Sequence, residues 1–372
     1  MSFVPADCAS IMADSQVAVE MAISRTTEVV SVIPILAHPT FVWFEHVVLF
    51  SSRLPLTARF RRTVMLPNVR KLFTIFTVSL IAVPLLFGQT ESAIKNVFWQ
   101  PNELQPGSAI FLTVELNHEA SRVSGHFFGK NLLFFHTRGA RAWYSLAGVD
   151  VETTTGTYDL SIRAALPGGR VARTVKAVEI GSVTFRTGDV SVPENFVQPD
   201  KASQREITAD EKLKERAFAH FISTPQWSGN FIKPVQAPPS DSFGMTRIFN
   251  EELTSEHRGT DFPIKEGSPV VTSNSGTVVL ARELFYEGNC VVLDHGQRLF
   301  TIYMHLSNIQ VRERQKVRKG QRLGLSGATG RVTGPHLHLG VRWDGSYIDP
   351  TKLLALTLPQ MNKVVRHKPS VR

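Results

Sequence analysis

GPHLHLGV, residues 334–341, is the stretch of this chain that best indicates its fold. A β-strand turns successive side chains to opposite faces, so His336 and His338 project on the same side. Neutral imidazole is a common metal ligand and a general base near neutral pH, so the pair could serve either role or divide them. The alternative is a chance pair that is packed or solvated, because the chain has 12 histidines.

Length and composition set the next limits. A chain of 372 residues, with 42% hydrophobic and 20% charged residues, is long enough for two domains that each bury a core. The formal charge of +9 indicates anionic surroundings such as nucleic acid, membrane headgroups or an acidic wall polymer. Cys8 and Cys290 are the only cysteines, which excludes a disulfide framework and a cysteine-based zinc finger. A metal site would therefore use histidines and carboxylates.

The N-terminal region contains one recognisable segment. Residues 1–64 show no clear organisation and stay unassigned. Residues 65–89 place Arg70 and Lys71 before an uncharged apolar run, 72–87, and a short polar exit. This pattern predicts a secretory signal sequence and an exported protein, and the alternative is an uncleaved membrane anchor. Because signal sequences stand at the N-terminus, we expect Met65 to be the true translation start.

Residues 93–190 read as an immunoglobulin-like β-sandwich that serves as an accessory domain. Short alternating segments are separated by turn residues, and Ile110, Leu112 and Val114 lie on one face of such a segment. The histidines of this region are scattered. We therefore interpret it as a positioning, binding or regulatory module.

Residues 191–242 are expected to form a linker with one helix. Thr208 and Glu211 match a capping box, and the apolar stripe that follows predicts a helix over 209–222. Several prolines after it favour extended chain. Residues 243–355 are predicted to be antiparallel β, with a disordered basic tail at 356–372.

Candidate site residues gather in three segments of this last region. EHRGTDF (256–262) contains His257 and Asp261, and TIYMHL (301–306) is expected to turn Thr301, Tyr303 and His305 to one face of a strand. Zinc hydrolases need three ligands from His, Asp or Glu, an open position for water and a nearby base. Together with the histidine pair at 336 and 338, these segments supply every part.

Three motifs carry a resemblance to a known family. HRGTD, YMHLS and GLSGATGRVTGPHLHLGV resemble the signatures of the lysostaphin-type, or LytM-like, zinc metallopeptidases, which cleave peptide bonds in bacterial peptidoglycan. SFGMTR (242–247) and VRKGQRLG (317–324) also match, so the likeness covers roughly 238–350. The sandwich and linker are similar, less specifically, to accessory domains that precede such catalytic domains.

The resemblance implies a site for one zinc ion per chain. His257, Asp261 and His338 would be the zinc ligands. His305 and His336 would lie on the open side of the metal, where they orient and deprotonate the attacking water or stabilise the oxyanion. The function implied is an exported zinc endopeptidase of the periplasm or cell envelope that hydrolyses peptidoglycan cross-links.

The expected partners follow from this function. They are peptidoglycan peptide stems and possible anionic wall polymers, with no nucleic acid, and a membrane only if segment 72–87 stays uncleaved. Two alternatives stay open: a catalytically silent protein that binds the wall or activates another hydrolase, and a secreted peptidase that acts on proteins. Loss of ligands is the mark of a silent member, and the ligand set here is intact.

Overall fold

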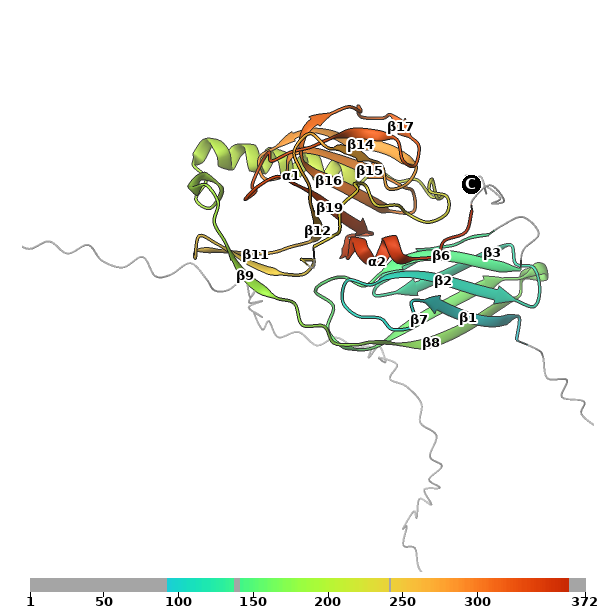
Figure 1. Ribbon diagram of the computed structural model, residues 1–372. Helices are drawn as coiled ribbons and strands as arrows, with labels where there is room; N and C mark the ends of the chain where they lie inside the picture. The colour runs from blue at the N-terminus through green and yellow to red at the C-terminus, as the bar shows by residue number, and fades with distance from the viewer. Residues whose placement is uncertain (1–91, 137–140, 241, 361–372) are drawn as a thin grey trace, which may run out of the picture. The chain divides into compact units, whose positions relative to one another are not determined.

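The computed structural model describes residues 92–136, 141–240 and 242–360 (Figure 1). The segments predicted at 1–64 and 65–89, and most of the predicted tail, lie outside the described residues. Within the described ranges the protein is mainly β, as predicted. No helix among these residues is both long and apolar enough to cross a membrane.

Two four-stranded antiparallel sheets form the first part of the described chain. Their strand orders are β1-β2-β6-β5 and β4-β3-β7-β8. The bounds of the strands are β1 (Ile94–Gln100), β2 (Ala109–Leu116), β3 (Arg122–Phe127), β4 (Lys130–Leu133), β5 (Phe135–His136), β6 (Ala142–Gly148), β7 (Gly156–Ala165) and β8 (Val171–Ile180), with a 3-10 turn at Pro167–Gly169. The specifically immunoglobulin-like topology stays a prediction.

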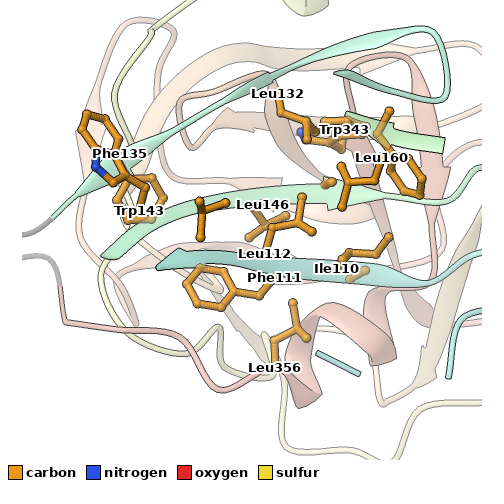
Figure 2. Close-up of a cluster of buried hydrophobic side chains, with 14 of the residues drawn as sticks. Ile110, Phe111, Leu112, Leu132, Phe135, Trp143, Leu146, Leu160, Trp343 and Leu356 are labelled. Atoms are coloured by element: carbon orange, nitrogen blue, oxygen red, sulfur yellow. The ribbon is translucent and has the colours of Figure 1, made fainter. Parts of the chain in front are cut away.

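One hydrophobic cluster joins both of these sheets to the C-terminal part of the chain. Leu112 of β2 and Leu160 of β7 lie in it, and so do Trp343 and Leu356 (Figure 2). Because residues of the C-terminal part also pack here, β2 is buried along almost its whole length on both of its faces. The chain beyond residue 355 therefore begins inside the core, since Leu356 and Leu358 are both buried.

The linker helix lies earlier than the sequence pattern predicts. Helix α1 spans Lys201–Phe218, and its N-cap is Asp200, whose carboxylate accepts a hydrogen bond from the Ser203 backbone N–H at 2.8 Å. The predicted range 209–222 was wrong at both ends. Thr208 does not cap a helix because its hydroxyl donates to the carbonyl of Gln204, one turn back in the same helix. A 3-10 turn at Glu194–Phe196 precedes α1.

A nine-stranded antiparallel sheet dominates the C-terminal part. Its main order is β12-β19-β16-β15-β14-β17, with β13, β18 and β20 paired at its margins. The bounds are β12 (Gly259–Pro263), β13 (Pro269–Val271), β14 (Gly276–Leu284), β15 (Gly288–Asp294), β16 (Leu299–Ile309), β17 (Lys316–Val317), β18 (Arg322–Ser326), β19 (His336–Trp343) and β20 (Ser346–Ile348). Helix α2 (Pro350–Ala355) follows the last strand.

The two faces of this sheet bury different residues. Leu337 and Leu339 of β19 pack with Tyr303 of β16 in one hydrophobic cluster. Ile302 belongs to a second cluster, which includes Ala217 of α1. Ile302 and Tyr303 are neighbours in β16 and therefore point to opposite faces of the sheet. Helix α1 thus lies on the face opposite to Leu337 and Leu339, toward which the even-numbered residues of β19 point.

A separate three-stranded sheet links the two parts of the chain. Strand β10 (Thr246–Phe249) pairs antiparallel with β11 (Leu253–Glu256) and parallel with β9 (Thr187–Val190). The chain leaves β11 at Glu256, one residue before His257. This small sheet therefore positions the start of the candidate site.

Candidate metal centre

Strand pairing brings His257, Asp261 and His338 together from distant parts of the sequence. β12 and β19 are antiparallel neighbours in which Asp261 is directly opposite His338. His257 precedes β12 and folds back toward the carboxylate. Directly opposed residues in an antiparallel pair have their Cβ atoms about 5 Å apart, which is close enough for the two side chains to share one ion.

Three donor atoms converge at this point. Nε2 of His257 lies 2.9 Å from Nδ1 of His338 and 3.1 Å from Oδ1 of Asp261, and the remaining distance, from His338 Nδ1 to Asp261 Oδ1, is 3.0 Å. Tetrahedral zinc with bonds of about 2.1 Å keeps its ligands roughly 3.4 Å apart, so the triangle is a few tenths of an ångström smaller. Two imidazole nitrogens and one carboxylate oxygen are also the ligand types that zinc accepts. This donor set fits a zinc ion.

The orientation of His257 is fixed by the backbone that precedes it. Its Nδ1 lies 2.7 Å from the carbonyl oxygen of Ser242, and a carbonyl can only accept, so Nδ1 carries the proton. The lone pair of Nε2 is then directed at the other two donors. The side chain is 4% exposed, which holds the ring in this position.

Arg247 contacts the far oxygen of the Asp261 carboxylate. Its guanidinium lies 2.5 Å from Oδ2, which leaves Oδ1 for the histidines. Burial alone would raise the pKa of Asp261, but the adjacent side chains of His257 and His338 outweigh it and hold the pKa below its usual range. The sequence motif SFGMTR contains Arg247, yet no property of that motif indicated that its side chain reaches a ligand.

Gly259 provides the space that His338 occupies. A Cβ placed on Gly259 would lie 2.3 Å from Nε2 of His338 and 2.7 Å from the carbonyl oxygen of Leu339. The imidazole therefore packs directly against the backbone of β12. A glycine between the two ligands of HRGTD is required by this close approach.

His305 does not share a face with Thr301 and Tyr303, contrary to the sequence prediction. Its φ is +64°, a left-handed conformation that interrupts the regular alternation of β16. Tyr303 stays in the core, whereas the ring of His305 lies 4.9 Å from that of His336 and 6.0 Å from that of His338. Backbone strain is thus concentrated beside the candidate ligands.

His305 and His336 each present a free Nε2 beside the three donors. Nδ1 of His305 donates to the Thr329 carbonyl at 2.9 Å, and Nδ1 of His336 donates to the Gly334 carbonyl at 2.8 Å. Nε2 of His336 lies 3.6 Å from Oδ1 of Asp261. Burial, reinforced by the two neighbouring imidazoles, lowers the pKa of His305 well below 6.5, so its ring is neutral near pH 7.

Three other ring side chains lie away from this site. Tyr303 is completely buried, and its hydroxyl accepts a hydrogen bond from the Ser273 backbone N–H, so it packs. His295 lies just after β15 and is fully buried between the Ser275 carbonyl and the Thr301 hydroxyl. The ring of His220 contacts Asp294 at 2.6 Å and is 43% exposed.

Comparisons with known proteins give the family of this domain. Residues 255–350 match the model of peptidase family M23. Peptidoglycan DD-endopeptidase ShyA of Vibrio cholerae is 58% identical over 126 residues, which cover 33% of this chain and 27% of that protein. DD-carboxypeptidase/endopeptidase Mpg of Neisseria meningitidis is 36% identical over 107 residues, 29% of this chain and 24% of that protein. The matched stretch thus spans about a quarter of the length of these relatives.

A solved structure covers more of the chain. The putative peptidase M23 from Pseudomonas aeruginosa is 26% identical, with a TM-score of 0.51, and the match covers 68% of this chain and 95% of that one. A match of this extent includes strands outside the peptidase region as well as within it. Residues 255–350 of this chain are therefore matched to peptidase family M23, and the solved structure of an M23 peptidase shares the fold.

Proposed function

We propose that the protein is an exported zinc endopeptidase that hydrolyses peptide cross-links of bacterial peptidoglycan. The observation that carries the proposal is the triangle of His257 Nε2, Asp261 Oδ1 and His338 Nδ1, with sides of 2.9 to 3.1 Å, beside two histidines with free Nε2 atoms. The relatives named as peptidoglycan endopeptidases support the substrate class. The apolar segment 72–87 supports export to the periplasm or cell envelope.

The triangle of donors would hold the metal. His257 and His338 contribute neutral imidazole nitrogens, and Asp261 contributes one negative charge through Oδ1, because Arg247 holds Oδ2. When it is bound, zinc supplies Lewis acidity that lowers the pKa of a water molecule toward neutrality and polarises a peptide carbonyl. With three protein ligands, a bound zinc ion would keep the open position that this chemistry requires.

The two remaining histidines move the protons. His305 is kept neutral by burial, so its Nε2 can accept a proton from the attacking water. An imidazolium at His305 or His336 then donates a proton to the leaving amine, and the second ring can hydrogen-bond the developing oxyanion. Both rings are held by backbone carbonyls at Nδ1, which keeps Nε2 directed at the reacting atoms.

Mass spectrometry of muropeptides after digestion tests this function and identifies the bond cleaved. We expect the wild-type protein to bind about one zinc and to shorten cross-linked muropeptides. His338→Ala should lose zinc and activity, His305→Ala should keep zinc but lose turnover, and exposed His126→Ala of the first part of the chain should behave like wild type.

The alternative functions give different results in the same experiment. Zinc-free protein that binds wall but never cleaves it would support a silent binding protein or an activator. Cleavage of unfolded proteins with muropeptides left intact would support a general secreted peptidase. Full turnover by His305→Ala would contradict the role proposed for that residue.

A further inference from the structure

Arg342 lies on the same face of the sheet as the ligand His338. Positions 338, 340 and 342 of β19 alternate with Leu339 and Val341, which are buried in hydrophobic clusters on the other side. At about 3.3 Å per residue, Arg342 is roughly 13 Å along the strand from His338. It is therefore within reach of a peptide bound at the metal centre.

The guanidinium of Arg342 has aromatic neighbours but no acceptor. Its Cζ lies 4.3 Å from the ring centre of Phe218 and 5.8 Å from that of Tyr347. Its Nε is buried without a hydrogen-bond partner, and no carboxylate in the described part of the chain pairs with it. A buried N–H is normally hydrogen-bonded, so the half-buried guanidinium of Arg342 is available to an anion.

Three neighbouring cations are paired with carboxylates, in contrast to Arg342. Each has a carboxylate oxygen within hydrogen-bonding distance: Arg258 with Glu152 at 2.6 Å, Arg298 with Asp344 at 2.6 Å, and Lys214 with Glu287 at 2.7 Å. A ligand carboxylate would meet an existing partner at each of those positions. Arg342 is the one among these four that offers a guanidinium without competition.

A hollow of about 290 Å³ lies against Arg342, and two of its lining residues, Arg258 and Met304, are sequence neighbours of the site residues His257 and His305. Residues from α1 and from the sheet line it, among them Lys214, Phe218, Arg258, Glu287, Met304 and Tyr347. Arg258 directly follows the ligand His257, and the carbonyl of Glu287 accepts a hydrogen bond from the backbone N–H of His305 at 2.9 Å. The hollow is thus lined in part by residues next to those that position His257 and His305.

We propose that Arg342 binds a carboxylate of the substrate peptide in this hollow and so determines specificity. A guanidinium matches a carboxylate with two parallel hydrogen bonds, which fixes the position of the ligand as well as its charge. Glu211 and Glu215 of α1 line the same hollow, which favours a carboxylate accompanied by an ammonium group over an isolated anion. This inference rests on the proposed peptidase function.

The spacing along β19 predicts where that carboxylate lies in the substrate. An extended peptide advances about 3.3 to 3.6 Å per residue, so roughly 13 Å corresponds to about four residues. The carboxylate should therefore be three or four residues from the bond that is cleaved. A second hollow of about 370 Å³ also touches Arg342 and is lined by Arg298 and Asp344, which pair with each other.

Isothermal titration calorimetry of metal-stripped protein tests the proposal without catalysis. The probes are cross-linked muropeptide dimers with free carboxylates and the same dimers after chemical amidation. Wild type should bind the free form at least about tenfold more tightly, because a hydrogen bond to a charged group contributes roughly 1.5–3 kcal/mol. Arg342→Met should bind both forms equally, and Arg342→Lys should recover part of the preference.

Arg298→Met is the matched control. Arg298 also stacks on an aromatic ring, with Cζ 5.3 Å from the centre of Phe221, but it is already paired with Asp344. It should keep the wild-type preference for the free carboxylate. In steady-state cleavage with zinc restored, Arg342→Met should raise KM about 10- to 100-fold at nearly unchanged kcat, whereas a purely structural role would lower the stability of the fold and affect both substrates alike.

The possible results distinguish the role of Arg342 from the peptidase function. Equal binding of the two forms by wild type, or a full preference retained by Arg342→Met, overturns the role of Arg342 and leaves the peptidase function standing. Preferential binding without cleavage in the presence of zinc overturns the peptidase function alone. If Arg342→Met does not fold, the comparison of free and amidated probes on wild type still decides the question.

Discussion

Gly259→Ala should disrupt the metal centre by adding a single methyl group. The backbone of Gly259 is not in the left-handed region, so alanine suits its conformation and only space opposes the change. The new Cβ would lie 2.3 Å from Nε2 and 2.5 Å from Cε1 of His338, and no real Cβ makes contacts under 3.0 Å. Either the imidazole or the strand must move.

Neither movement is easy. The ring of His338 is held on its other side by Asp261 at 3.0 Å, and the carbonyl of Leu339, 2.7 Å from the new Cβ, belongs to the ladder between β12 and β19. Overpacking of this kind costs about 1–3 kcal/mol of unfolding free energy. Displacing a ligand should also weaken zinc binding by roughly 10- to 100-fold, as loss of a supporting contact does.

Urea unfolding of the metal-free protein and chelator competition for zinc measure the two effects separately. Gly334→Ala is the control, because a Cβ there meets nothing within 4 Å although the residue is two positions from His336. It should change stability by no more than about 0.5 kcal/mol. Unfolding and zinc affinity of Gly259→Ala that match this control would refute the packing argument.

Three further changes should have distinct outcomes. Tyr303→Phe should lower the free energy of unfolding by about 1–3 kcal/mol, because the buried Ser273 N–H loses its acceptor, while kcat and KM of the folded fraction stay unchanged. Burial lowers the pKa of His295 to about 4 from 6.5, so the fold favours the neutral ring; the stability this contributes is complete above pH 6.5 and is lost as the pH falls toward 4. The free energy of unfolding lost in this way is at most about 3 kcal/mol. The difference in unfolding free energy between pH 7.5 and pH 4.5, measured with urea, should therefore be smaller for His295→Gln than for wild type. Removing zinc with a chelator should abolish cleavage and lower the unfolding temperature, both restored by zinc, because the ion binds only the folded state.

The sequence predicted the mainly β fold because its signals are local. Alternating apolar residues and turn chemistry fall within five to ten residues, and strands form where these occur. The helix boundary failed for a local reason as well. Thr208 has the residue type of a cap, but Asp200 caps the helix two turns earlier and leaves the Thr208 hydroxyl to bond within the helix.

The candidate site was less predictable because part of it depends on irregular backbone. Strict alternation would put His305 with Tyr303 in the core, and only the positive φ at His305 turns it toward His336. The partnership of Arg247 with Asp261 depends on how β10 packs beside β12, which no spacing in the sequence encodes. Resemblance to a family supplied the residue list where periodicity could not.

The difference between His336 and His338 illustrates how strand register assigns chemistry. Both project from one face of β19 and both are imidazoles, so the strand alone does not distinguish a ligand from a base. The neighbouring strand does. Asp261 is directly opposite His338, whereas His336 is opposite Pro263, which has no donor atom to offer a metal. In the function proposed above, the carboxylate and His338 would share an ion, and Nε2 of His336, 3.6 Å from the same carboxylate oxygen, would lie beside it to carry a proton.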